Sequence, residues 1–117
     1  MASGLATRGY GDTQTVGIDS QQLTQVATVE LAGIILGDAS EAVTLLEDRM
    51  AGADVMVISC ARLIRIDFTA AGTLLNWASA RQAEGRQVQF VEVHRLIAAF
   101  FNVIGIGEHA RIVARRD

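Results

Sequence analysis

The chain has no proline, only one cysteine and few aromatic residues (5% of 117 residues). The single cysteine, Cys60, excludes an intramolecular disulfide framework and a zinc site built from several thiolates. Because proline is absent, glycine is the main residue that marks the ends of helices and strands. Ten basic residues stand against 13 acidic ones, a net charge of −3. This balance does not indicate the clustered basic surface of a nucleic-acid-binding protein, so we expect no nucleic-acid partner.

A long hydrophobic run is also missing. The most apolar stretch, Leu96–Ile106, is interrupted by Asn102 and is far shorter than the ~20 residues of a membrane span. Residues 1–15 contain charged side chains and no apolar segment of a secretory signal. We expect residues 1–15 to be a flexible lead-in. Because half of all residues are apolar, we expect residues 16–117 to form one packed domain. We expect this domain to lie in the cytoplasm.

Strand-like and helix-like segments alternate along the chain, which predicts an α/β fold. Val55–Ser59 is a nearly continuous apolar run, typical of a central strand covered on both faces. Gly33 is expected to end the first well-defined strand. The expected strands are Val26–Leu31, the run from Asp54 to Ser59, Val88–Val91 and Ala110–Val113, with a weaker one at Val16–Gln22. The expected helices are Ser40–Met50, with Asp38 or Ser40 as its N-cap, Thr69–Glu84, and His94–Val103 with Leu96, Ile97, Phe100, Val103 and Ile104 on its buried face.

Few residues have the spacing of a catalytic or metal site. Cys60, His94 and His109 match no structural zinc pattern, and a buried cysteine commonly serves as apolar filler. The segment Gly33–Gly37 lacks the Lys-Ser/Thr of a phosphate-binding loop. We therefore expect no metal, no cofactor and no enzymatic activity.

Asp67 and Thr69 stand where an apolar segment meets the start of a helix. Both side chains are suited to cap the helix by accepting N–H bonds from its first turn. A second interpretation is that Thr69 presents its hydroxyl at the positive end of the helix, where an added phosphate would be stabilised. Spacing alone does not choose between the two interpretations.

The segment from Ile66 to Leu75, Ile-Asp-Phe-Thr-Ala-Ala-Gly-Thr-Leu-Leu, resembles the signature of STAS domains. These are small α/β domains of bacterial anti-sigma-factor antagonists and sulfate transporters. The order of elements is similar from about residue 16 to residue 114. The resemblance implies a mixed four- to five-stranded β-sheet with helices packed mainly on one side.

The resemblance also implies a regulatory role without catalysis. Antagonists of this family bind a partner-switching kinase that acts as an anti-sigma factor, and a Ser or Thr just after the signature Asp is phosphorylated. Thr69 occupies that position and is the candidate phosphoacceptor. The candidate partner-binding residues are Asp67, Phe68, Thr69, Ala70, Thr73 and Trp77. Trp77 is expected on the flank of the helix, where it is either a partner contact or a boundary residue that packs on the neighbouring helix.

This chain departs from the antagonist pattern at three positions. Phe68 replaces a small or hydroxylated residue, Ala70 replaces the usual glycine, and Leu36 stands where an acidic residue often assists kinase contact. The alternative is therefore a scaffold that is not phospho-regulated, such as a STAS subunit that grips a transporter ATPase or a domain of a larger protein. A homodimer through the region of Phe100 and Phe101 is a further open alternative. Because some STAS domains are reported to bind nucleotides or lipids, the resemblance also leaves open a ligand-sensing role.

Overall fold

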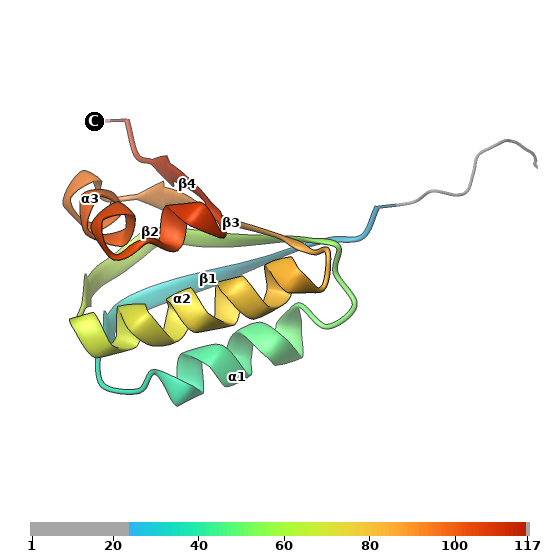
Figure 1. Ribbon diagram of the computed structural model, residues 1–117. Coiled ribbons are helices and arrows are strands. Elements are labelled where there is room, and N and C mark those ends of the chain that lie inside the picture. The colour runs from blue at the N-terminus through green and yellow to red at the C-terminus, as the bar shows by residue number, and fades with distance from the viewer. Residues whose placement is uncertain (1–23, 117) are drawn as a thin grey trace, which may run out of the picture.

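The computed structural model describes residues 24–116, which form an α/β sheet structure (Figure 1). Its elements alternate along the chain as the sequence predicts, and the α/β class is confirmed. They are, in chain order, β1 (Val26–Ile35), α1 (Ser40–Arg49), β2 (Val55–Ile66), α2 (Phe68–Ala83), β3 (Gln87–Val93), α3 (Arg95–Ile104), the short 3-10 helix η1 (Ile106–Glu108) and β4 (Arg111–Ala114).

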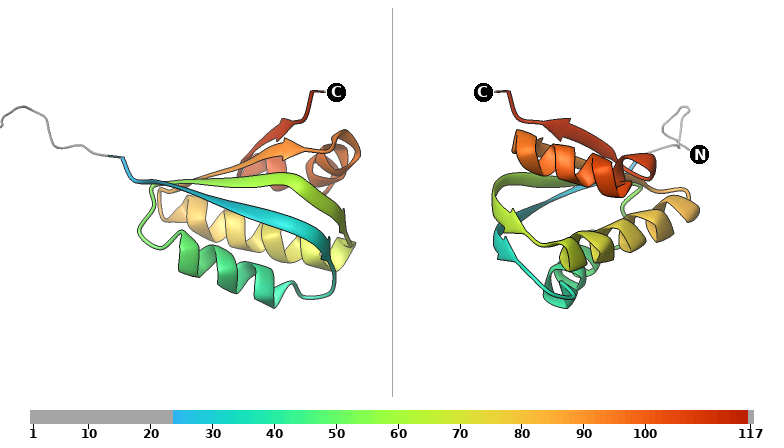
Figure 2. Two further views of the ribbon diagram at one scale, coloured as in Figure 1. Left: turned by 180° about the vertical axis from the view of Figure 1, so that it is seen from behind. Right: turned by 60° about the vertical axis from the view of Figure 1, so that its left-hand side comes forward.

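The four strands follow one another across the sheet in the order β1-β2-β3-β4. All three pairings are parallel, so the part of the chain described by the structure is a parallel rather than a mixed sheet. The weaker strand expected at Val16–Gln22 lies outside the described residues. Each crossover connection moves in the same direction along the sheet. Because such connections are right-handed, the helices lie on one face, as Figure 2 shows.

The central strand β2 is therefore covered by helices on one face only, among residues 24–116. Met56, Ile58 and Cys60 are fully or almost fully buried beneath the helices. The alternate residues Val55 and Val57 are half-buried on the opposite face. The expectation that this strand is covered on both faces is corrected, because the apolar run does not say on which side the crossovers pass.

Two strands are longer than the sequence predicts. β1 continues through Gly33 to Ile35, with Gly33 at a φ of 79°. β2 is one continuous strand from Val55 to Ile66. The register between them shifts twice, between Glu30 and Ala32 and between Gly33 and Ile34. These irregularities let pairing continue past a residue that the sequence suggests as a strand end.

The core lies between the sheet and the three helices. Phe90 of β3 and Phe101 of α3 are both fully buried, and their rings meet edge to face with centroids 5.5 Å apart. The expected buried face of α3 is partly wrong, because Leu96 and Val103 are 76% and 83% exposed. The helix is turned so that Ala98 and Phe101 face the core.

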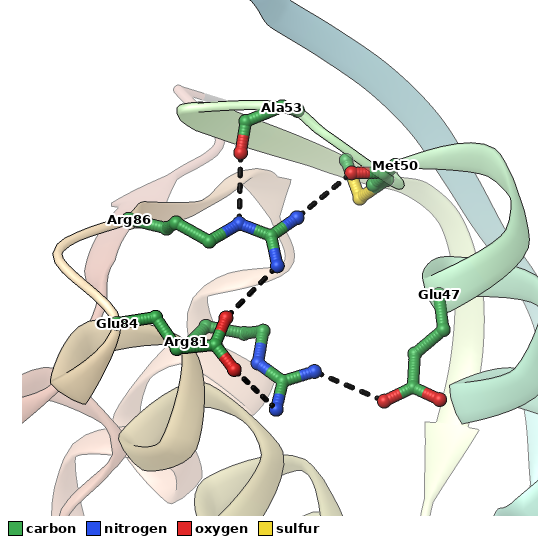
Figure 3. Close-up of polar contacts among 6 residues, drawn as sticks. All are labelled: Glu47, Met50, Ala53, Arg81, Glu84 and Arg86. Atoms are coloured by element: carbon green, nitrogen blue, oxygen red, sulfur yellow. Dashed lines mark hydrogen bonds and ion pairs between the residues drawn. The ribbon is translucent and has the colours of Figure 1, made fainter.

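An arginine-centred network closes the end of the sheet at which β2 and β3 begin (Figure 3). The guanidinium of Arg86 donates to the carbonyl oxygens of Ala53 at 2.8 Å and Met50 at 2.9 Å. Arg86 also pairs with Glu84. Glu84 in turn pairs with Arg81 at 3.2 Å. The network ties the last turn of α1 to the turn that follows α2.

Candidate interaction site

The candidate site is built around the N-terminus of α2, at the other end of the sheet. Asp67 is the N-cap residue of α2, and its Oδ1 accepts a hydrogen bond from the N–H of Ala70 at 2.8 Å. Its Oδ2 accepts a second one from the N–H of Gly37 at 3.0 Å. One carboxylate thus caps a helix and holds the β1–α1 loop against it.

The two N–H donors also set the charge state of the site. The hydrogen bond from Gly37, followed by that from Ala70, lowers the pKa of the Asp67 carboxyl. Arg65 adds a smaller attraction for the ionised form. Asp67 therefore brings a fixed negative charge to the start of α2, where the helix dipole favours it.

Phe68 and Thr69 form the exposed first turn of α2. The Phe68 side chain is 70% exposed, and its ring centroid lies 6.5 Å from that of Phe100. Thr69 is exposed as the second residue of the helix. Its carbonyl oxygen accepts a hydrogen bond from the hydroxyl of Thr73, one turn on, at 3.3 Å. Thr73 itself is half-buried.

Two of the expected contact residues lie in the core instead. Ala70 is fully buried, so its small side chain is covered by the helix packing. Of the two interpretations of Trp77, burial favours packing within the molecule over a partner contact, because only 5% of this residue is exposed. Its ring lies beneath the guanidinium of Arg81, with 6.0 Å from the guanidinium carbon to the ring centroid. The flank of α2 that carries Trp77 is covered by packing that helical periodicity does not specify.

The loop before α1 also differs from the expectation. The N-cap residue of α1 is Ala39, with a left-handed φ of 55°, and its side chain makes no capping bond. Asp38 accepts from the N–H of Ser40 at 3.1 Å and so closes a local turn. Leu36, at the position where antagonists often have an acid, is 52% exposed.

The residues that could have suggested a metal or thiol site lie apart. Cys60 is fully buried, and burial raises the pKa of its thiol to about 12, which suits the role of apolar filler. His94 is the N-cap of α3 and accepts from the N–H of Leu96. His109 contacts Gln82. Among residues 24–116, no three His, Cys, Asp or Glu side chains group as metal ligands would.

Sequence reasoning missed three residues at this end of the molecule. Gly37, the second partner of Asp67, carries no side-chain signal that could reveal it. Ile64 and Leu96 are 72% and 76% exposed, although apolar residues at such positions are usually assigned to a core. The arginines on either side of Ile64 in the sequence, Arg62 and Arg65, are the one signal that could have indicated a surface strand.

A parallel sheet with helices on one face, and an Asp that caps the helix after the second strand, define a small α/β domain of the STAS kind. The family model described as "Mlab, STAS domain" matches residues 11–114 of this chain. The chain therefore belongs to the STAS domain family, a family of regulatory and protein-interaction domains that are generally non-catalytic. Comparison with curated proteins and with solved structures gave no match. Within residues 24–116, no helix is long and apolar enough to cross a lipid bilayer.

Proposed function

We propose that this protein is a non-catalytic regulatory module that binds a partner protein through the N-terminal turn of α2. The partner class is an anti-sigma factor of the serine-kinase type, and the module acts in the cytoplasm. The observation that supports this proposal is the placement of Phe68 and Thr69. Both are exposed and adjacent on the first turn of α2, which Asp67 caps and links to the β1–α1 loop by hydrogen bonds.

Phosphorylation of Thr69 is the proposed switch. A phosphate there adds about two negative charges at neutral pH, beside the ionised carboxylate of Asp67. The helix N-terminus stabilises this charge within the free module. A partner surface that packs on Phe68 would have to cover it, and removing a charge from water without a counter-charge is costly. Phosphorylation therefore weakens docking while the fold is kept.

A second candidate function is a constitutive scaffold, such as a subunit that grips a transporter ATPase. The observation that favours it is the exposure of Leu36 and Phe68, which are 52% and 70% exposed on the β1–α1 loop and on the first turn of α2, the two segments joined by Asp67. Two large apolar side chains at the start of the helices suit a contact that stays buried. In that case the hydroxyl of Thr69 has no regulatory role.

The test is capture of partners from lysate of the native host with wild-type, Thr69→Glu and Thr69→Ala bait, read by mass spectrometry. We expect wild type and Thr69→Ala to hold a kinase-type anti-sigma factor and Thr69→Glu to lose it. Incubation of the purified pair with ATP should then add one phosphate to wild type and none to Thr69→Ala.

Thr44→Glu provides the matched control, since Thr44 is an exposed threonine on α1. It adds the same charge away from the proposed surface and should keep the partner. Equal capture of a kinase by the Thr69→Glu and Thr69→Ala baits would reject the proposal that phosphorylation of Thr69 is a switch. Capture of a transporter ATPase by every bait, including Thr69→Glu, would establish the scaffold instead.

A further inference from the structure

The strands β2 and β3 separate beyond the middle of the sheet. Their pairing ends at Ser59 and Val91, although β2 continues to Ile66. The left view in Figure 2 shows the two strands diverging toward the end at which α2 begins. The edge of β2 that faces β3 thus has no strand beside it from Cys60 onward, within the described residues. The carbonyl oxygen of Ala61 accepts a hydrogen bond from the guanidinium of Arg115, at 3.4 Å.

A groove of about 420 Å³ lies where the strands have separated. It runs between the second half of β2, the start of α3 and the residue that follows β4. Leu63 is buried in its wall, whereas Ile64 of β2 and Leu96 of α3, which also line it, are 72% and 76% exposed. Its lining residues are Ala61, Arg62, Leu63, Ile64, His94, Leu96, Ile97 and Arg115. Apolar side chains thus line part of a concave surface.

The charged residues that line the groove are all basic. Arg62 and Arg115 line it, together with His94, and no Asp or Glu does. This is notable in a chain whose net charge is −3. Arg62 lies 3.7 Å from Glu30, and both side chains of this pair are open to solvent. Such an exposed pair is weak and exchanges readily for another carboxylate. The guanidinium of arginine fits a carboxylate with two parallel hydrogen bonds.

We propose that this groove binds an acidic, apolar segment of a partner protein: a Leu, Ile or Phe side chain between Ile64 and Leu96, flanked by carboxylates that pair with Arg62 and Arg115. Charge complementarity favours an acidic occupant, and the apolar lining favours a peptide over a nucleic acid, which would be attracted by the arginines but has no apolar side chain for the groove. The proposal goes beyond the docking surface at Thr69, because no residue of α2 lines the groove.

The test uses fluorescein-labelled synthetic peptides in which Leu or Phe alternates with Glu, and a matched set in which Lys replaces every Glu. Binding to the full-length protein is measured by fluorescence anisotropy at low and high salt. We expect the Glu peptides to bind, with affinity that falls as salt rises, and the Lys peptides not to bind. Equal binding of both sets, or binding of neither, would overturn the proposal.

Variants locate the binding site on the protein. Leu96→Ser should weaken the Glu peptides by about tenfold or more through lost apolar contact. Arg62→Glu should slow association and reduce the salt dependence. Arg49→Glu, the matched control on α1, should bind the peptide like wild type, and circular dichroism confirms that each variant is folded. Wild-type binding by Leu96→Ser and Arg62→Glu would place the peptide elsewhere and reject the groove.

Two further readouts separate this inference from its alternatives. Thr69→Glu should bind the Glu peptides like wild type. Peptide binding in the groove and the phosphorylation switch at Thr69 can therefore each be rejected without rejecting the other. Loss of peptide binding in Thr69→Glu would contradict an independent groove. Co-sedimentation with phosphatidylglycerol vesicles checks for a lipid surface. Vesicle binding that Leu96→Ser abolishes, without peptide binding, would overturn the proposal in favour of a membrane.

Discussion

The two ends of the sheet are held together in different ways. At the end where β2 and β3 begin, the side chains of Arg86 and Arg81 tie together α1, α2 and the adjoining turns. At the other end, the Asp67 carboxylate joins the first turn of α2 and the β1–α1 loop through one N–H bond each. Large apolar side chains are exposed there, among them Phe68 and Leu96.

This difference teaches how a small domain can expose an apolar surface and stay folded. The helices and strands are fixed to one another where their charged residues meet, away from the candidate surface. The carboxyl ends of parallel strands are also where α/β sheets most often bind their ligands. The first end is therefore expected to determine stability and the second to determine binding, and substitutions can test each part of that division.

Among the substitutions of polar residues, the largest effect is expected from Arg86→Ala, which breaks the network of Figure 3. The carbonyl oxygens of Met50 and Ala53 would lose their charged donor. A hydrogen bond to a charged group contributes about 1.5–3 kcal/mol to stability. We expect the free energy of unfolding to fall by about 2–4 kcal/mol in urea titrations. Arg49→Ala, an exposed arginine of α1, controls for lost charge. Equal losses of stability in Arg86→Ala and Arg49→Ala would show that the network does not stabilise the fold.

A smaller effect, dependent on pH, is expected from Asp67→Asn. The N–H groups of Gly37 and Ala70 lower the pKa of this carboxyl in the folded state, relative to its ordinary value in the unfolded chain. The stabilisation is therefore complete above the unfolded pKa and is lost as the pH falls through the folded pKa.

Urea unfolding at neutral and acid pH checks this prediction. Asp67→Asn should be less stable than wild type at neutral pH, and the difference should shrink in acid. Asp48→Asn, on the exposed side of α1, removes the same charge without a bridge between loops. A constant difference between Asp67→Asn and wild type across the pH range would rule out the ionised bridge.

A still smaller change, of opposite sign, is expected from Glu92→Gly. Glu92 has a left-handed φ of 56°, within the shift of register between β3 and β4. A non-glycine residue is strained there, so glycine should raise the free energy of unfolding by about 0.5–1 kcal/mol after its own entropy cost. Gly33→Ala is the converse case at another position, since Gly33 has a φ of +79°. It should lower the free energy of unfolding, although the added Cβ would meet no atom within 4 Å. Thermal unfolding measures both, and a destabilising Glu92→Gly would contradict the strain.

The smallest effect on stability is expected from Phe68→Ser. The side chain is 70% exposed, so the free energy of unfolding should stay within about 0.5 kcal/mol of wild type. Partner capture should nevertheless be lost if Phe68 anchors the contact. Phe101→Ser marks the contrast, since this ring is fully buried and its loss should cost at least about 3 kcal/mol. A large loss of stability in Phe68→Ser would place this ring in the core instead.

Much of the fold could be predicted from the sequence because local signals agree with the tertiary structure. Asp67 after an apolar segment predicts a capped helix, and it caps α2. The alternation of strands and helices likewise predicts the α/β class. The prediction that Leu96 is buried was wrong, and the burial of Trp77 stayed open, for one shared reason. Helical periodicity gives the angle between side chains on a helix, and the angle at which that helix meets the sheet depends on contacts with distant residues.

The candidate site divides in the same way between local and distant contributions. From the amino-acid sequence alone it follows that a hydroxyl, that of Thr69, stands just after a helix-capping carboxylate, because that arrangement is local to one turn. The three-dimensional fold was needed to show that Gly37 shares this carboxylate and that β2 and β3 separate to leave a groove. Those features depend on the register between strands and on which loops meet, and both are settled by packing between residues far apart in the chain.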